Sequence, residues 1–218
     1  MADMTASGPG LRRTQAERRA ASEAALLQAA AELIAEVGIE RTSLRGVSER
    51  AGISRAMPAY HFGSKDGLVD RLVHHAYERT VAATTVALRP SQGDLDQLSR
   101  LDLLRAIIET YLTIVGSGAS VEERAVIVMW GATFPAGADL PVMVQADQAT
   151  HRALADTIRD GQQDGSIRAD LDADAAALLL MGMARGAAAM SLAHPTAADP
   201  ARVRDLCGQT ITAVLGRP

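Results

Sequence analysis

Residues 52–69 read GISRAMPAYHFGSKDGLV, a stretch too polar for a core helix and too short for an independent one. Pro58 lies inside it, and Lys65 is the only lysine among the 22 basic residues of the chain. Gly52, at its start, permits the positive φ of a tight turn. Just before that turn, Ser43 can cap a short helix through Ala51. The turn therefore follows a helix.

A second short helix is predicted directly after the turn. Ser54 can cap it and Gly63 can end it. Two short helices joined in this way predict a helix-turn-helix, in which the second helix can enter the major groove of DNA. Arg55, in the first turn, can offer a bidentate pair to guanine O6 and N7, while Ala56 and Met57 can meet a thymine methyl group. The stretch therefore predicts a DNA-reading element.

The residues that follow suit contacts with phosphate. Tyr60 and His61 lie at the far end of the second helix, where they can reach phosphate oxygens; alternatively, His61 is a helix-end residue packed beside Phe62. Lys65 begins the next helix, where its charge and the helix N-terminus both favour an anion. A lysine acts there as a point charge and does not need the fork of an arginine. The lone lysine is therefore predicted to contact a phosphate.

The charge distribution supports a polyanion partner for this part of the chain only. The net charge of the 218 residues is −4. Residues 11–65 hold nine basic against six acidic residues, whereas residues 66–218 hold 13 against 19. A basic N-terminal quarter on an acidic body indicates nucleic acid binding by that quarter. Four arginines before the helix-turn-helix could track the DNA or form a solvated basic tail: Arg12, Arg13, Arg18 and Arg19.

The rest of the chain reads as helices, with aromatics at only 3% and no strand-like alternation. Residues 1–13 have no periodicity and are predicted to be a disordered lead. Capping and stop signals predict seven helices besides the two already described. They run from Thr14 to Gly38, from Ser64 to Pro90, from about Leu101 to the GSG at 116–118, from Ser120 to Pro135, from Pro141 to Gly165, from Asp172 to His194 and from Asp199 to near the C-terminus. The predicted fold is all-α, with about nine helices.

Cysteine usage and hydropathy favour a cytoplasmic protein. Cys207 is the only cysteine, which excludes an intramolecular disulfide framework, and no signal peptide pattern is apparent. The segment Ala175–Ala193 is apolar enough to suggest a membrane span, but Arg185 lies near its middle. A central arginine costs about 2.5–3.5 kcal/mol on insertion. The segment is therefore expected to be buried in protein, with no membrane partner.

The stretch TSLRGVSERAGISRAMPAYHFGSKDGLVDRL, residues 42–72, closely resembles the DNA-binding signature of TetR-family transcriptional regulators. AGIS, YHFGSK and GLV are its most specific parts. The resemblance implies a homodimer that binds a palindromic operator in double-stranded DNA and represses transcription. It also implies a small-molecule inducer, bound within helices four to seven, that swings the fourth helix and separates the two reading heads. The implied organisation is a DNA-binding domain at 14–63 and a ligand-binding and dimerisation domain at 64–218.

The resemblance assigns DNA contacts to matching positions: Thr42, Ser43, Arg45, Ser54, Arg55, Ala56, Met57, Tyr60, His61 and Lys65. Two positions depart from the family pattern. Ala59 stands where the family often has a tyrosine, so Tyr60 is expected to take over part of that phosphate contact. Pro58 removes an early helical hydrogen bond if the helix starts at Ser54. It leaves the set of base-reading residues open.

Two further sets of residues are predicted from the helical stripes and the resemblance. Candidates to line an apolar ligand pocket are Tyr111, Met129, Trp130 and Phe134, with His151 as a polar contact; plain core packing is the alternative for each. The implied interface between helices eight and nine of two subunits contains Leu178, Gly182, Arg185, Gly186, Ala189, Val203, Leu206, Ile211 and Val214. Gly182 and Gly186 lie four apart, so they could instead serve close packing within one subunit.

Competing functions find less support in the sequence. We find no Gly-rich phosphate loop, no nucleophile elbow and no His/Cys cluster with metal-ligand spacing, so neither an enzyme nor a cofactor is expected. Asp70, His74 and Glu78 share one helical face, which we interpret as an exposed charged surface and not as a metal site. The remaining alternative is a helical dimeric interaction protein that does not bind DNA. Such a protein would not need Arg45, Arg55 and Lys65.

Overall fold

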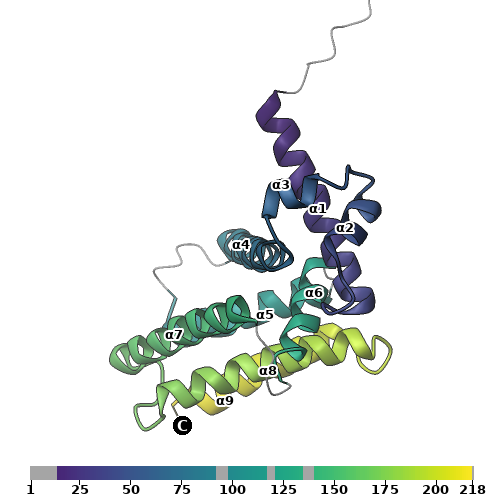
Figure 1. Ribbon diagram of the computed structural model, residues 1–218. Coiled ribbons are helices and arrows are strands. Elements are labelled where there is room, and N and C mark those ends of the chain that lie inside the picture. The colour runs from purple at the N-terminus through teal and green to yellow at the C-terminus, as the bar shows by residue number, and fades with distance from the viewer. Residues whose placement is uncertain (1–13, 92–97, 117–120, 135–139, 218) are drawn as a thin grey trace, which may run out of the picture.

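The computed structural model describes residues 14–91, 98–116, 121–134 and 140–217. Within these ranges the chain forms nine helices and no strand, which confirms the predicted all-α fold (Figure 1). The helices are α1 (Gln15–Val37), α2 (Leu44–Ala51), α3 (Met57–Phe62), α4 (Lys65–Ser91), α5 (Arg100–Gly116), α6 (Val121–Gly131), α7 (Pro141–Asp164), α8 (Ala173–Ala193) and α9 (Pro200–Leu215). The predicted disordered lead, Ser120 and Pro135 lie outside the described residues.

Local capping signals set most of the helix ends. Thr14 and Glu17 form the predicted capping box of α1, with the Thr14 amide donating to the Glu17 carboxylate at 2.7 Å. Ser43 caps α2 by accepting a hydrogen bond from the Gly46 amide. Gly52 ends α2 in the left-handed conformation, at φ 66°, where a side chain would be strained. The predicted tight turn between the two short helices is therefore confirmed.

The predicted start of the second short helix is wrong. Ala56, and not Ser54, is the N-cap residue of α3, and no side chain caps that helix. Pro58 explains the difference. In a helix that started after Ser54, residue 58 would have to donate the first helical hydrogen bond, and proline has no amide hydrogen. The helix instead begins at Met57, with Pro58 in its first turn, where that missing hydrogen costs nothing.

The fourth helix begins as predicted and ends slightly later. Ser64 caps α4 by accepting from the Gly67 amide at 3.1 Å. Gly67 is required there, because a Cβ atom at this position would lie within 2.2 Å of the Phe62 carbonyl oxygen. The helix runs to Ser91, one residue beyond the Pro90 that was predicted to close it.

Two hydrophobic clusters hold the helices together. One joins α1, α2, the start of α4, α6 and the start of α7; its fully buried large side chains include Leu26, Ile34, Leu72 and Met129. The other joins α5, α7, α8 and α9, around Leu104, Ile158, Leu180 and Ile211. Figure 1 shows α4 between the short helices and the bundle, with α8 and α9 side by side along its far edge. The fourth helix therefore contacts both halves of the molecule.

Among the described residues, α8 is the only helix long and apolar enough to cross a membrane by length and composition. One third of its most apolar window is buried inside the subunit. Core helices of water-soluble proteins pass the same test, so the property alone is weak evidence for a membrane span.

Candidate DNA-binding surface and ligand cavity

The exposed face of the helix-turn-helix brings two predicted DNA contacts together around a carboxylate. Arg45 Nε lies 2.9 Å from Glu49 Oε1, and Arg55 Nη2 lies 3.2 Å from the same oxygen. The hydrogen bond from Arg45 is the main cause that holds the pKa of Glu49 below its ordinary value. The two guanidinium groups are therefore held on one exposed face, and Glu49 is a residue of this face that the sequence analysis missed.

Residues of α3 extend this surface. Ala56 and Tyr60 are exposed, whereas Met57 is half-buried against the N-terminal hydrophobic cluster. The guanidinium carbon of Arg19, on α1, lies 5.7 Å from the centre of the Tyr60 ring. This contact places Arg19 beside a predicted phosphate contact, which favours the DNA-tracking alternative for this arginine.

His61 and Lys65 lie at the end of α3 and the start of α4. His61 Nε2 is 3.2 Å from Ser22 Oγ on α1, and the ring is half-buried, so it also serves packing. Lys65 Nζ donates to the Glu40 carbonyl oxygen at 3.4 Å. That long bond leaves the ammonium available to a stronger acceptor such as a phosphate oxygen.

Thr42 does not present its side chain to a ligand. It is only 4% exposed, and its hydroxyl donates to the Gly38 carbonyl at 2.9 Å. This bond closes the loop between α1 and α2, so the hydroxyl is used within the subunit, and the DNA contact of Thr42 stays a prediction. Ser43 is exposed but already engaged as the cap of α2, and Ser54 is exposed in the turn before α3.

A cavity of about 440 Å³, which we call the inner cavity, lies between α4, α5, α6, α7 and α8. Tyr111 is the one predicted pocket residue that lines it. Its walls are mainly aliphatic, with hydroxyl groups on α4, α5 and α7. The lining residues are Ala76, Tyr77, Thr80, Val81, Thr84, Thr85, Leu103, Ile107, Tyr111, Glu123, Val126, Thr150, Leu154, Met181, Ala184 and Arg185. Such a wall suits an apolar molecule that carries a few hydrogen-bonding groups.

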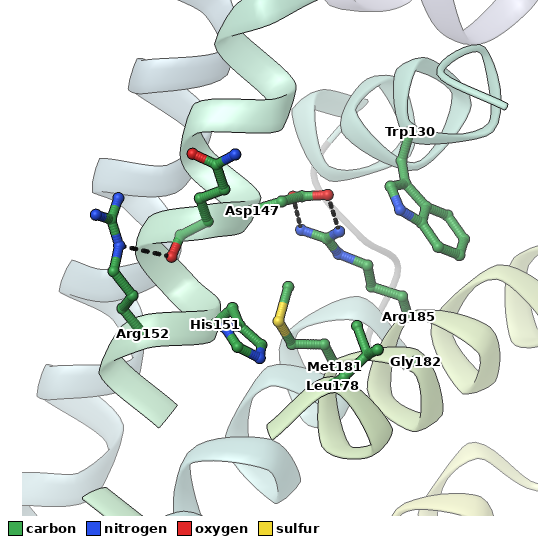
Figure 2. Close-up of a pocket in the computed structure, with 9 residues that line it drawn as sticks. Trp130, Asp147, His151, Arg152, Leu178, Met181, Gly182 and Arg185 are labelled. Atoms are coloured by element: carbon green, nitrogen blue, oxygen red, sulfur yellow. Dashed lines mark hydrogen bonds and ion pairs between the residues drawn. The ribbon is translucent and has the colours of Figure 1, made fainter. Parts of the chain in front are cut away.

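A second cavity of about 580 Å³, the outer cavity, opens between α6, α7 and α8 (Figure 2). Trp130 and His151, both predicted as pocket residues, line it. The His151 ring nitrogen Nε2 is 3.0 Å from the Asp174 carbonyl oxygen. Met181 and Arg185 line both cavities. The two cavities therefore share a wall.

Two of the predicted pocket residues line neither cavity. Met129 is fully buried in the N-terminal hydrophobic cluster, so its stripe position reflects core packing. Phe134 is 67% exposed and its ring lies 4.9 Å from that of Trp130, beyond the last turn of α6. The pocket predictions for these two residues are wrong, because helical periodicity separates inward from outward residues but does not locate voids among inward ones.

Three polar side chains form the shared wall, and we call them the polar cluster: Tyr77 on α4, Asp147 on α7 and Arg185 on α8. Arg185 Nη1 donates to Asp147 Oδ2 at 2.7 Å, and Nη2 donates to Tyr77 Oη at 2.7 Å (the Asp147 pair is drawn in Figure 2). Tyr77 Oη in turn donates to Asp147 Oδ1 at 3.2 Å. The Arg185 guanidinium carbon also lies 5.5 Å from the centre of the Trp130 ring.

Burial and the neighbouring charges shift the pKa values of two members of the polar cluster. Burial raises the pKa of the Tyr77 hydroxyl to about 12, and the charge of Asp147 adds to this effect. Burial is the largest single influence on the pKa of Arg185 and lowers it, but the hydrogen bond to Asp147 and the charge interactions with Tyr77 and Asp147 together outweigh burial, and the net shift is upward. Tyr77 is therefore neutral and Arg185 charged at physiological pH.

Two adjacent acidic residues of α6 are also buried, and the sequence analysis missed them. Glu122 is 4% exposed and accepts a hydrogen bond from Arg79 Nη1 at 2.8 Å. Glu123 is 6% exposed, accepts a hydrogen bond from Thr80 and lines the inner cavity. Burial raises the pKa of Glu123 above its ordinary value. The available signal was the run of three consecutive charged residues, 122–124, at the start of an otherwise apolar helix.

The predicted interface residues fall into an exposed set and an inward set. Leu178 and Leu206 are 65% and 61% exposed, which is unusual for leucine and leaves both reachable by a partner. Gly182 is exposed, and the half-buried positions are Gly186, Ala189, Val203 and Val214. Ile211 is 1% exposed inside the subunit core, and the Arg185 side chain is 13% exposed and turned into the polar cluster. Both side chains are used within the subunit, and the assignment of the whole set to an interface stays a prediction.

No group of three or more potential metal-ligating side chains occurs among the residues that the structure describes. Asp70 and His74 form an exposed pair on α4, with Oδ2 and Nδ1 3.5 Å apart.

Comparisons with known proteins agree with this arrangement. Residues 26–72 match the family model for bacterial regulatory proteins of the tetR family, and residues 100–216 match the model for the C-terminal domain of BetI-type transcriptional repressors. The HTH-type transcriptional repressor KstR2 of Mycolicibacterium smegmatis is 27% identical over 178 residues, which are 80% of this chain and 76% of that protein.

Solved structures share the fold at low sequence identity. The fatty acid degradation regulator FadR from Bacillus halodurans has a TM-score of 0.72 at 13% identity, over 92% of this chain and 96% of that chain. AibR, solved in complex with isovaleryl coenzyme A and operator DNA, has a TM-score of 0.67 at 17% identity, over 88% and 97%.

Proposed function

The chain belongs to the TetR family of bacterial transcriptional regulators, and we propose that it acts as a homodimeric repressor that leaves a palindromic operator when a small molecule occupies the inner cavity. Residues 14–63 form the DNA-binding domain in this proposal, and residues 64–218 form the ligand-binding and dimerisation domain. Members of this family are soluble DNA-binding proteins. The protein accordingly works in the cytoplasm, without enzymatic turnover.

The paired arginines of the helix-turn-helix carry this proposal. Arg45 and Arg55 project from the exposed face of α2 and of the turn before α3, and both contact Glu49. A bidentate guanidinium is the side chain that most often reads guanine in the major groove. Ser43, Ser54, Ala56 and Tyr60 are exposed as well, and Met57, His61 and Lys65 are half-buried. A stability role would not require two arginines on an exposed surface.

The inner cavity supports the ligand part of the proposal. Its 440 Å³ lie within the usual range for small-molecule sites, and α4 forms one of its walls. AibR, a relative in fold, was solved with both a small ligand and operator DNA. A ligand needs only to bind the DNA-incompetent state better than the competent state to release the operator.

The exposed leucines support the homodimer. Leu178 on α8 and Leu206 on α9 would bury most of their side chains against a second copy, with Gly182, Gly186, Ala189, Val203 and Val214 around them. Small residues at such positions allow the helices of two subunits to approach closely.

Selection from random duplex DNA tests the function directly. The purified protein is incubated with the pool, and the bound DNA is recovered and sequenced. We expect a palindrome whose half-sites lie about one helical turn, roughly 34–36 Å, apart. Absence of any enriched sequence at low salt, where phosphate contacts are strongest, would contradict the proposal.

A double substitution separates repression from the alternative of a DNA-independent interaction protein. Arg55→Ala with Lys65→Ala should abolish binding to the selected operator, because both charges leave the DNA-binding surface. The mass of the dimer should stay unchanged, since neither residue lies on α8 or α9. Retained operator binding would remove these two residues from the contact set, and loss of the dimer would favour the interaction protein.

A further inference from the structure

The polar cluster connects four of the helices that surround the two cavities. Its three members come from α4, α7 and α8, and the Arg185 guanidinium also faces Trp130 on α6. Arg185 and Tyr77 line the inner cavity, whereas Arg185, Asp147 and Trp130 line the outer one. A molecule in the inner cavity therefore meets Tyr77 and Arg185 directly.

The hydrogen bonds of the cluster depend on one another. The Tyr77 hydroxyl accepts from Arg185 and donates to Asp147, so it closes a ring of three polar groups. Such groups are costly to leave unpaired in a poorly solvated wall, which favours a fully closed or a fully rearranged state over intermediate ones. A small displacement of Tyr77 can thus convert the cluster from its closed state to its rearranged state.

Helix α4 connects Tyr77 to the DNA-binding surface. The helix carries Lys65 in its first turn, and Tyr77 lies twelve residues further on, which is about 18 Å along a continuous helix. Near its start, Leu68 and Leu72 pack against the N-terminal hydrophobic cluster together with side chains of α1 and α2. A shift of α4 at Tyr77 therefore moves the surface that carries the DNA contacts.

We propose that the Tyr77–Asp147–Arg185 cluster is a latch that holds α4 in its DNA-binding position, and that a ligand in the inner cavity releases α4 by displacing the Tyr77 hydroxyl from Arg185. The inference rests on the proposed function and adds to it the residues that transmit the signal. Tyr77 is a positioning residue in this scheme, because it touches no DNA.

The test uses Tyr77→Phe, which removes the hydroxyl and keeps the ring. Loss of one such hydrogen-bonding group should weaken binding to the selected operator about threefold to tenfold without any added ligand. Thr113→Val is the control, because the exposed Thr113 hydroxyl on α5 donates to the Glu109 carbonyl of its own helix and lines neither cavity. It should bind the operator as the unaltered protein does. Both variants should keep the dimer mass and helical content of the parent.

Trp130 provides a second readout within the unaltered protein. It is the only tryptophan of the chain and lies beside Arg185, on a different helix from any predicted DNA contact. Operator binding should therefore change Trp130 emission, excited at the red edge where DNA does not absorb. The change should be largely lost in Tyr77→Phe and retained in Thr113→Val.

The outcomes distinguish a failure of the latch from a failure of the proposed repressor function. Operator affinity of Tyr77→Phe equal to or above that of the parent, or Trp130 emission indifferent to operator in the parent, would overturn the latch while leaving the repressor intact. Failure of the parent to select any operator would overturn both.

Discussion

Two arrangements of arginine and carboxylate in this molecule behave in opposite ways. On the exposed face of the helix-turn-helix, Arg45 and Arg55 share Glu49, and at least half of each side chain is exposed to water. In the wall between the cavities, Arg185 and Asp147 form a forked pair with 13% and 27% of their side chains exposed. Exposed pairs contribute little to stability and are screened by salt, whereas breaking a buried pair leaves an uncompensated charge. The exposed arrangement can be exchanged for a phosphate or a base, and the buried one acts as a fixed structural joint.

The largest expected effect concerns the buried pair. Arg185→Met leaves the Asp147 carboxylate without its main partner and should lower the free energy of unfolding by about 3–5 kcal/mol. Urea denaturation at fixed protein concentration measures the loss. Adding Asp147→Leu should restore most of it, because no charge then remains buried.

Arg152→Met is the control for that comparison. Arg152 lines the same outer cavity but is exposed, and its Nε donates only to the Gln148 carbonyl (Figure 2). A loss as large as that of Arg185→Met would show that burial of the pair is not what distinguishes it.

A smaller effect is expected at Glu123, which burial makes reluctant to ionise. Because its pKa is raised in the folded state, the folded protein holds this proton to higher pH than the unfolded chain does, and the contribution to stability falls as pH rises through that interval. Glu123→Gln removes the ionisation and keeps an acceptor for Thr80. It should therefore stabilise the protein at neutral pH by on the order of 1 kcal/mol, the scale of single buried polar groups.

The stabilisation by Glu123→Gln should shrink as the pH is lowered, since the carboxyl of the parent is then protonated as well. Thermal unfolding at acid and neutral pH measures the difference. Glu78→Gln, at an exposed carboxylate of α4, is the control and should show no such pH dependence. A constant gain at both pH values would assign the effect to packing.

The smallest effect on stability is expected where the carboxylate is exposed. Glu49→Gln should leave the midpoint of thermal unfolding unchanged, yet strengthen operator binding by a few-fold, because it removes a negative charge between the two arginines that are proposed to contact DNA. Fluorescence anisotropy with labelled operator measures the gain. Glu78→Gln changes net charge equally at a distance from the DNA-binding surface, and an equal gain there would assign the effect to overall charge.

The helices were predictable because their signals are local. Thr14 with Glu17, Gly52 and Asp172 act within a few residues of the helix ends that they define. The start of α3 failed for a local reason too, since Pro58 overrides the capping tendency of Ser54. The presence of each helix could therefore be predicted from the sequence. The start of α3 depended on whether Ser54 or Pro58 had the stronger local effect.

The cavities were less predictable because their residues are distant in sequence. Tyr77 and Asp147 are 70 residues apart, and Asp147 and Arg185 are 38 apart. Periodicity places each on an inward or outward stripe but does not say which inward residues meet across a void. Arg185 was assigned to a subunit interface from the family resemblance, which does not show that its side chain joins three helices within the subunit.

The shortened α3 limits how much sequence one subunit can recognise. Six residues at 1.5 Å each span about 9 Å, close to three base-pair steps of 3.4 Å. A DNA sequence of so few base pairs recurs by chance very many times in a bacterial chromosome. In the proposed dimer, the fixed spacing between two such half-sites adds the specificity that a single α3 helix lacks. The relative position of the two subunits therefore helps to determine which DNA sequences the protein recognises.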